Sequence, residues 1–252
     1  MAGPQCCTNP PTLIPGFGEG SVTELGGLKA YVTGTSSSST PAILLASDVY
    51  GYEAPNLRKL ADKVATAGFY VVVPDFFYGD AYNPRDVAKP LGMFVDIHKP
   101  VKGFEDAKSV VAALRSKGIS AIGAAGFCWG AKVVVELAKS NYIQAAVLLH
   151  PTFVTVNDIK ETRAPIAVLG AEFDRTSPPE LLKQFEQVIS ASSEIDGYVK
   201  IFPRVSHGWT VRYKVGDERT IKSAEEAHEN MLDWFLKYAK SSDGGQRYPA
   251  RL

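Results

Sequence analysis

The sequence predicts a single doubly wound α/β domain with a mostly parallel sheet. Short apolar runs recur along the 252-residue chain, amphipathic segments of helical period separate them, and most of the runs show no polar alternation. Strands of this kind are buried on both faces, as in a parallel sheet covered by helices on each side. The chain shows no repeat of about 20–50 residues, which excludes solenoids and propellers.

The N-terminal part of the chain is predicted to be extended. Residues 1–27 are rich in Pro, Gly and Thr, and residues 35–40 form a Ser/Thr-rich turn between two apolar runs. The first continuous apolar run, at 41–47, predicts a strand, and apolar residues at helical spacing within 54–67 predict the helix that follows. We therefore expect an N-terminal lead-in over 1–27, ahead of the folded domain.

The alternation of strand and helix continues to the end of the domain. Further strands are predicted at 69–74, 119–127, 143–149, 165–169 and 198–202. Further helices are predicted at 101–117, 129–140, 178–190 and 221–238. Prolines and glycines interrupt any period over 78–99, so this irregular insertion is expected to act as a cap or substrate loop. We expect one domain over 28–240 without an internal boundary, and a flexible tail over 241–252.

Charge and cysteine content exclude several classes of protein. The 27 Lys and Arg residues balance 27 Asp and Glu residues, so the chain lacks the basic surplus of a protein that binds nucleic acid or anionic membranes. The 3 cysteines do not suit a disulfide scaffold, and no apolar run is long enough to span a membrane. Residues 1–20 lack the features of a secretory signal. We therefore expect a protein of the reducing cytoplasm.

The most informative motif is Gly126-Phe-Cys128-Trp-Gly130, which lies between a predicted strand and a predicted helix. It matches the nucleophile elbow Gly-x-nucleophile-x-Gly, with cysteine as the nucleophile. The elbow is a strained turn, and side chains at the two glycine positions would collide with neighbouring backbone. At the start of the helix Cys128 would be stabilised as a thiolate, and the Trp129 N–H would face a developing oxyanion. The alternative is a buried structural cysteine beside a tight turn.

An acid and a histidine follow Cys128 in the order that the elbow requires. Asp174 follows a later predicted strand and His207 follows the last one, which are the positions of the acid and the base in this type of fold. Glu172 is the alternative acid. His228 lies within the last predicted helix, and we expect it on the solvated surface.

Together these motifs resemble those of the dienelactone hydrolase (carboxymethylenebutenolidase) family of α/β-hydrolases. The resemblance covers about residues 28–238 and includes the elbow, the segment that ends at Asp174 and the motif Ser206-His207-Gly208. It implies the single-domain α/β-hydrolase fold and a monomer. It also implies a triad in which Cys128 is the nucleophile, His207 the general base and acid, and Asp174 the residue that orients His207.

The resemblance implies further site residues. Asp48 corresponds to an acidic residue, usually Glu, that contacts the resting thiol, and the N–H of Val49 completes the oxyanion hole with that of Trp129. Asp is one methylene shorter than Glu, and a turn-capping role is the alternative for Asp48. Arg212 and Arg85 are the candidates for binding a substrate carboxylate, although only Arg212 lies near the catalytic histidine in the sequence.

The expected activity is hydrolysis of a small ester or lactone through a thioester on Cys128, without a cofactor. The small-molecule substrate is the one partner that we expect. No metal site is expected, because His228-Glu-Asn-Met-Leu lacks the second histidine of a zinc-protease helix. Two alternatives remain open. Some plant chains that resemble this one are labelled endo-1,3;1,4-β-D-glucanase, and a hydrolase fold can also serve as a non-catalytic ligand receptor.

Overall fold

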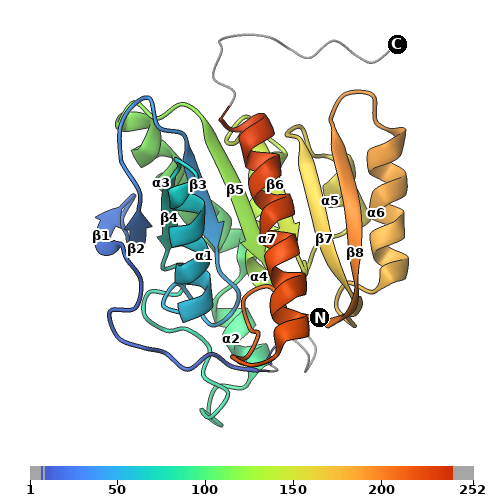
Figure 1. The fold of residues 1–252 in the computed structure, drawn as a ribbon, viewed down its shortest axis with the longest axis horizontal. Helices are drawn as coiled ribbons and strands as arrows, with labels where there is room; N and C mark the ends of the chain where they lie inside the picture. Colours follow the sequence, from blue (N-terminus) through green and yellow to red (C-terminus); the bar gives the residue numbers. More distant parts are fainter. Residues whose placement is uncertain (1–6, 8, 241–252) are drawn as a thin grey trace.

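The chain forms an eight-stranded sheet with helices on both faces (Figure 1). The computed structural model describes Cys7 and residues 9–240, so the tail predicted at 241–252 lies outside the described residues. The strands are β1 (Ser21–Leu25), β2 (Leu28–Thr33), β3 (Ala42–Ala46), β4 (Tyr70–Pro74), β5 (Ile122–Phe127), β6 (Ala145–Leu149), β7 (Ile166–Phe173) and β8 (Gly197–Ser206). The helices are α1 (Pro55–Thr66), α2 (Leu91–Ile97), α3 (Pro100–Ser116), α4 (Trp129–Ala138), α5 (Val156–Lys160), α6 (Pro179–Ala191) and α7 (Glu218–Tyr238). The predicted doubly wound α/β architecture is confirmed.

The strand order places the ends of β3 and β5 next to each other. The sheet runs β1-β2-β4-β3-β5-β6-β7-β8, with β2 antiparallel to both of its neighbours and the strands from β4 to β8 parallel. From β3 the chain moves outward to β4 and then returns to β5 on the other side of β3. In open α/β sheets ligands bind at such a reversal, at the carboxyl ends of the strands. The loop after β3 and the turn after β5 meet at this point, because Ala46 pairs with Gly126.

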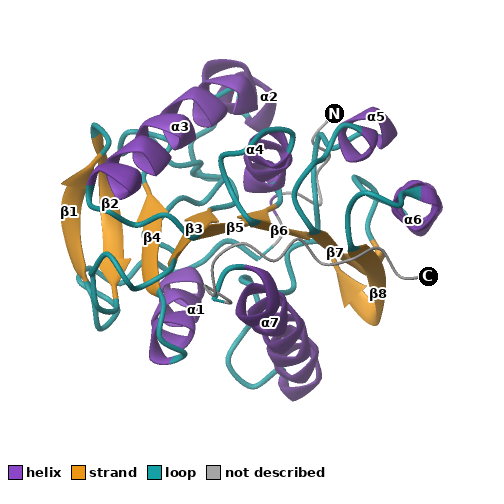
Figure 2. Cartoon of the chain, turned by 90° about the horizontal axis from the view of Figure 1, so that it is seen from above, coloured by secondary structure: helices purple, strands orange, loops and turns teal. Residues whose placement is uncertain are grey.

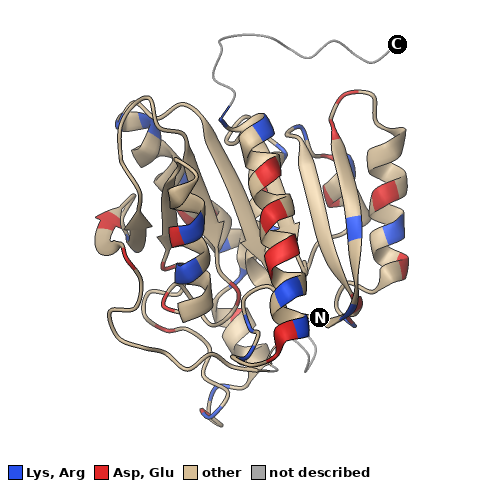
Figure 3. Cartoon of the chain, in the orientation of Figure 1, with Lys and Arg blue, Asp and Glu red and all other residues tan. Residues whose placement is uncertain are grey.

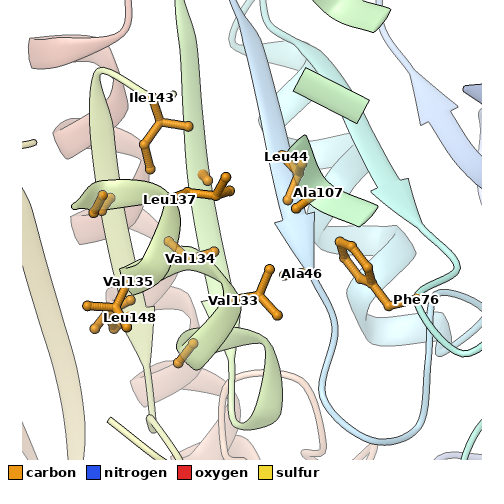
Figure 4. Close-up of a cluster of buried hydrophobic side chains, with 14 of the residues drawn as sticks. Leu44, Ala46, Phe76, Ala107, Val133, Val134, Val135, Leu137, Ile143 and Leu148 are labelled. Carbon is orange, nitrogen blue, oxygen red and sulfur yellow. The ribbon is translucent and has the colours of Figure 1, made fainter. Parts of the chain in front are cut away.

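Two apolar layers, one on each face of the sheet, form the core. Helices α1 and α7 cover one face, and α2 to α6 lie on the other (Figure 2). Successive residues of β3 alternate between the layers, because Ile43 and Leu45 belong to the cluster that includes α1 and α7, whereas Leu44 belongs to the other. Figure 4 shows part of the second cluster, which contains Leu44 of β3 and Val133 of α4. Burial on both faces explains why the strands are continuous apolar runs in the sequence.

Charged side chains lie mainly on the helical surface. Both signs occur on α1, α6 and α7 (Figure 3), whereas the inner strands β3, β4, β5 and β6 contain no charged residue. Among the described residues, no helix has the length and apolar character needed to cross a membrane.

Two segments contain elements that the sequence pattern did not predict. The lead-in expected over 1–27 includes β1, an edge strand whose side chains are mostly exposed, so no apolar run marks it. The insertion expected over 78–99 is not wholly irregular, because it includes α2, which begins after Pro90 and buries only Phe94. A helix with one buried side chain leaves no helical period in the sequence.

Strand β8 is longer than the predicted 198–202. It runs to Ser206 past an irregularity in its pairing with β7, where Arg204 has a φ of 59°. An irregularity in a strand interrupts the alternation of apolar and polar residues from which the strand is predicted, so the prediction ended before it. The extension delivers the chain directly to His207 at the edge where β3 and β5 end.

Candidate active site

Cys128 occupies the turn between β5 and α4 in a strained backbone conformation. Its φ of 53° and ψ of −110° lie in a region that residues with a side chain rarely adopt. A Cβ on Gly130 would overlap the carbonyl oxygen of Ala46 in β3, and a Cβ on Gly126 would overlap that of Gly130. The Cys128 N–H donates to the Leu149 carbonyl at 3.1 Å, which fixes the turn against β6. This geometry is that of a nucleophile elbow.

The Cys128 side chain is fully buried and contacts two polar groups. Its sulfur lies 3.4 Å from the Thr152 hydroxyl, and the side chain of His207 hydrogen-bonds it. Thr152 is held in turn, because its N–H donates to the Cys128 carbonyl at 3.1 Å. A cysteine that only fills a core is surrounded by apolar groups. The polar contacts of Cys128 therefore favour a functional thiol.

His207 connects Cys128 to a buried acid. Its Nδ1 lies 2.6 Å from Asp174 Oδ2, which leaves the other ring nitrogen for Cys128. Three groups donate to Asp174 Oδ1: the Thr176 N–H at 2.8 Å, the Thr176 hydroxyl at 2.6 Å and the Ser177 N–H at 3.2 Å. These donors fix the carboxylate, and through it the plane of the imidazole. The structure thus brings together the three residues of the predicted triad.

Opposing effects set the proton affinity of His207. Burial lowers the pKa of His207, but the neighbouring Cys128 charge and the hydrogen bonds with Asp174 and Cys128 raise it to about 9. Burial raises the pKa of the Asp174 carboxyl, but its contacts with His207 and Thr176 bring it below its ordinary value. Both shifts favour an imidazolium beside a carboxylate. Because Cys128 has the largest raising effect on His207, the charge of the imidazole depends on the state of the sulfur.

Asp48 and Arg212 form a buried ion pair beside the triad. Each side chain is 2% exposed, and Arg212 Nε lies 3.2 Å from Asp48 Oδ2. The Tyr50 N–H donates to Asp48 Oδ1 at 3.0 Å, and the Arg212 guanidinium lies 5.7 Å from the centre of the Tyr50 ring. Burial raises the pKa of Asp48, against the opposing effects of Arg212, the Tyr50 N–H and His207. Asp48 therefore makes the turn hydrogen bond that was one of its predicted roles, and it also holds Arg212.

Val49 and Trp129 follow the adjacent strands β3 and β5 at the same edge of the sheet. Trp129 is the first residue of α4, so its N–H has no partner within the helix. The Trp129 indole donates to the His98 carbonyl at 2.8 Å, and the Tyr82 N–H donates to the Val49 carbonyl at 2.9 Å. These contacts fix the two backbone segments whose N–H groups were predicted to bind an oxyanion.

Two of the sequence candidates lie away from the triad. Glu172, the alternative acid, is exposed and accepts a hydrogen bond from the Arg204 N–H at 2.6 Å. Arg85 is exposed, and its N–H donates to the Asn83 side chain at 3.0 Å. Of the two candidate arginines, Arg212 is therefore the one that lies beside the triad.

Two further histidines support the loop that carries His207. His150 is fully buried, its Nε2 lies 2.8 Å from the Thr210 hydroxyl, and its ring centre lies 5.1 Å from that of His207. His228 Nε2 lies 2.9 Å from the Thr210 carbonyl. The prediction that His228 lies on the solvated surface is wrong, because it is 5% exposed. Its spacing from the buried Met231 of α7 could have signalled this, since residues three apart share a helix face.

A cavity of about 320 Å³ lies beside the triad. Its walls include Asn9, His207, Arg212, Tyr213 and Lys214. A larger hollow, of about 600 Å³, lies over α1 and has no triad residue in its walls, so we assign it no role in the chemistry. Among the described residues, no group of three His, Cys, Asp or Glu side chains could hold a metal ion.

Comparison with known proteins assigns the family. The model of the dienelactone hydrolase family matches residues 28–239, and the chain belongs to this family of hydrolases. A Zea mays relative named endo-1,3;1,4-beta-D-glucanase is 45% identical over 197 residues, which cover 76% of this chain and 63% of that relative. A carboxymethylenebutenolidase homolog from Xenopus tropicalis is 29% identical, over 87% of this chain and 91% of its own. This chain thus spans less than two thirds of the length of the maize relative.

Solved structures share the fold. The crystal structure of a putative dienelactone hydrolase from Klebsiella pneumoniae has a TM-score of 0.70 at 20% identity, over 84% of this chain and 93% of that one. A thermophilic esterase from Thermogutta terrifontis has a TM-score of 0.66 at 14% identity, over 94% of this chain and 97% of its own. The predicted family and its α/β-hydrolase fold are confirmed.

Proposed function

We propose that this chain hydrolyses small carboxylic esters or lactones, with Cys128 as the nucleophile, His207 as general base and acid, and Asp174 as the residue that orients His207. The observation that carries the proposal is the continuous set of contacts from the Cys128 side chain through His207 to Asp174, at a strained elbow. Nucleophile, base and orienting acid within hydrogen-bond reach of one another are the arrangement required for covalent catalysis.

The reaction would proceed through a thioester. The Cys128 sulfur attacks the carbonyl carbon, and the N–H groups of Val49 and Trp129 hold the oxyanion. His207 then gives its proton to the departing alkoxide, which leaves an acyl group on Cys128. In the second half, His207 takes a proton from water, which attacks the thioester, and the acid product departs. No cofactor takes part in these steps.

The coupling between Cys128 and His207 suits each half-reaction. In the resting enzyme the Cys128 charge helps to hold the His207 pKa at about 9, so the imidazole carries the proton that the leaving group needs. In the acyl-enzyme the sulfur is a neutral thioester, so the largest of the effects that raise the His207 pKa is lost, while Asp174 still raises it and burial still lowers it. The imidazole then releases its proton more readily and can act as a base.

The site favours small substrates. Cys128 is fully buried, and the cavity beside His207 and Arg212 has a volume of only about 320 Å³. Arg212 is the candidate for binding a substrate carboxylate. Because Arg212 already pairs with Asp48, the substrate carboxylate would share the guanidinium with the Asp48 carboxylate. We propose that the protein works in the cytoplasm, where reducing conditions keep a thiol nucleophile free. We also propose that it is a monomer with no partner other than its substrate.

Hydrolysis of β-glucan is the second candidate, and the maize relative's name is the observation that favours it. Glycosidases use two carboxyl groups that flank the bond. Here the two buried carboxylates near Cys128 are already engaged, Asp174 by His207 and Thr176, and Asp48 by Arg212. The site therefore supports acyl transfer better. Release of reducing sugar from mixed-linkage glucan by the pure protein, abolished in Asp174→Asn or Asp48→Asn but retained in Cys128→Ala, would reverse this preference.

The decisive experiment is the mass of the intact protein after brief exposure to p-nitrophenyl acetate. We expect one acetyl group on the wild type, mapped to the peptide that contains Cys128, and none on Cys128→Ala. Cys6→Ala is the matched control and should acylate like the wild type. Full hydrolytic activity in Cys128→Ala would disprove the cysteine mechanism, and absence of both adduct and turnover would favour a non-catalytic ligand receptor.

A further inference from the structure

Cys7, far from the triad in sequence, lies at the catalytic site. The Tyr50 hydroxyl donates to the Cys7 carbonyl at 2.8 Å, and the Tyr82 hydroxyl hydrogen-bonds the Cys7 thiol. Both tyrosines belong to the loops around Val49: Tyr50 follows it, and the Tyr82 N–H donates to its carbonyl. Cys7 packs against the apolar cluster that contains Cys128. The segment that we expected to be a plain lead-in therefore contributes a second thiol to the site.

Neighbouring contacts place the same part of the chain over the cavity. Asn9 is part of the cavity wall that also contains His207 and Arg212. The Tyr50 ring, whose hydroxyl binds Cys7, lies under the Arg212 guanidinium at 5.7 Å from its centre. Cys7 itself is partly buried and is not in a disulfide. Cys7 and Asn9 thus lie along the side of the site formed by Tyr50, Arg212 and His207.

The charges that act on Cys7 are those of the catalytic site. Burial and, after it, the Cys128 charge raise the pKa of the Cys7 thiol, and the Arg212 charge opposes both, so that the pKa is about 11. At neutral pH Cys7 is therefore a protonated thiol that does not compete with Cys128 as a nucleophile. The hydrogen bond from Tyr50 and the packing of Cys7 against the apolar cluster of Cys128 place the two cysteines on the same side of the site.

We propose that Cys7 is the resolving cysteine for oxidation of Cys128, so that peroxide converts the pair into a reversible disulfide that switches the enzyme off. The proposal rests on the proposed function only in taking Cys128 as a reactive thiolate. Hydrogen peroxide is the oxidant. The Cys128 sulfur attacks one peroxide oxygen, the O–O bond breaks, and hydroxide leaves, so that the sulfur loses two electrons and becomes a sulfenic acid.

Cys7 completes the reaction. Its sulfur attacks the Cys128 sulfur, the S–O bond breaks, and the proton lost by Cys7 leaves with the hydroxyl group as water. Oxidation itself prepares Cys7 for this step, because the neutral sulfenic acid no longer carries the Cys128 charge that raises the Cys7 pKa, whereas Arg212 still lowers it. Tyr50 holds the Cys7 carbonyl and Tyr82 holds the Cys7 thiol, so formation of the S–S bond requires the Cys7 sulfur to exchange Tyr82 for Cys128.

The experiment treats the reduced full-length protein with hydrogen peroxide, blocks free thiols with N-ethylmaleimide in acid, and maps the peptides by mass spectrometry. We expect loss of two hydrogen atoms, a peptide pair linked through Cys7 and Cys128, and loss of ester hydrolysis, all reversed by dithiothreitol. Cys7→Ser and Cys7→Ala should instead take up two oxygen atoms at Cys128 as sulfinic acid, and dithiothreitol should not restore their activity.

Cys6→Ser is the matched control, because it removes a neighbouring thiol and should leave the Cys7–Cys128 link intact. A link from Cys128 to Cys6, or reversible inactivation retained in both Cys7 variants, would overturn the proposal. Peptide mapping detects the sulfur bond without turnover. A Cys7–Cys128 link in a protein that hydrolyses no ester would therefore support the redox pair while the proposed hydrolase function fails. Ester hydrolysis by a protein that forms no Cys7–Cys128 link would support the hydrolase function and overturn the redox pair.

Discussion

The charge on one sulfur governs much of the chemistry at the residue scale. His207 is buried, which alone would make it a weak base, yet its pKa is raised to about 9 because it lies between Cys128 and Asp174. The elbow holds the Cys128 backbone in a conformation that residues with a side chain rarely adopt, and Asp174 orients the imidazole towards the sulfur. Proton position at this site is therefore a property of the pair rather than of either residue.

Replacing Cys128 by Ala should lower the pKa of His207 from about 9, because the largest raising effect is removed while burial still lowers the pKa. The measurement is an NMR titration of the histidine Cε1 protons in both proteins. His228, whose pKa is about 4, is the internal control and should not move. A His207 resonance that titrates near 9 in the variant would contradict the coupling.

Thr176 is a positioning residue for the triad. Its hydroxyl donates to Asp174 Oδ1 at 2.6 Å and lies 3.0 Å from His207 Nδ1. A hydrogen bond to a charged group contributes about 1.5–3 kcal/mol, so Thr176→Val should lower kcat by about tenfold or more. We also expect the acid limb of the pH–rate profile to move to higher pH. The reason is that the Asp174 carboxyl loses one of the groups that lower its pKa.

The control for Thr176→Val is Thr162→Val. The Thr162 hydroxyl is also buried and donates to the Ile159 carbonyl at 2.8 Å, just after the end of α5. Both variants lose a buried hydroxyl, so a general loss of stability would affect both. Equal kcat values and equal pH profiles in the two variants would argue against a positioning role for Thr176.

At the element scale, the parts of the site that a local pattern encodes were predictable. The elbow is specified by residues 126–130, because two glycines and a nucleophile within five positions already determine the turn. His207 was found from its place after the last strand. The Asp48 and Arg212 pair was not, because it depends on how the β3 and β8 loops meet across the sheet, and no spacing along the chain records that contact.

The absence of a local sequence signal also explains why Cys7 was not predicted at the site and why His228 was predicted on the surface. Cys7 reaches the site through the hydroxyl groups of Tyr50 and Tyr82, and its own neighbours in the sequence are only Cys, Thr and Asn residues without a period. His228 was expected on the solvated surface because it lies within the last helix, whereas its ring faces the loop at Thr210. Polar residues that satisfy a buried carbonyl are not distinguishable from surface residues by composition.

The contact between the elbow and β3 gives a prediction about stability. A Cβ on Gly130 would overlap the Ala46 carbonyl oxygen, and neither strand β3 nor α4 can move without losing its packing. Gly130→Ala should therefore lower the free energy of unfolding by about 3 kcal/mol or more, measured by urea denaturation. Gly92→Ala in α2 is the control, since a Cβ there meets open space. Comparable loss in both variants would mean that the overlap is relieved at little cost.

At the scale of the whole molecule, the order of the strands explains why residues separated by more than a hundred positions meet. The reversal between β3 and β5 opens the sheet edge where the loop with Asp48 and the turn with Cys128 lie, and the parallel strands β7 and β8 end at the same edge with Asp174 and His207. The parallel arrangement was predictable from the continuous apolar runs. The antiparallel hairpin of β1 and β2 was not, because β1 is exposed at the edge of the sheet.

The stability of the whole domain should depend on His228 in acid. Burial lowers the pKa of His228, the hydrogen bond to Thr210 opposes it, and Lys63 and Lys59 of α1 add to it, so that the pKa is about 4. The unfolded chain would take up a proton at its ordinary pKa of 6.5, while the folded chain would not. Folding is therefore unaffected by this group above about pH 6.5 and is progressively disfavoured as the pH falls towards 4, by about 3 kcal/mol in total.

The measurement is the free energy of unfolding by urea from pH 8 to pH 4, for the wild type and for His228→Gln. Gln lacks the titration but can still donate to the Thr210 carbonyl, so the variant should lose less stability between pH 6.5 and 4 than the wild type does. His150, whose pKa is also lowered by burial, should leave part of the slope in both proteins. The two curves should run parallel towards pH 8, where both histidines are largely unprotonated in the folded and the unfolded chain. Curves that stay parallel down to pH 4 would show that α7 moves to let His228 reach water before the domain unfolds.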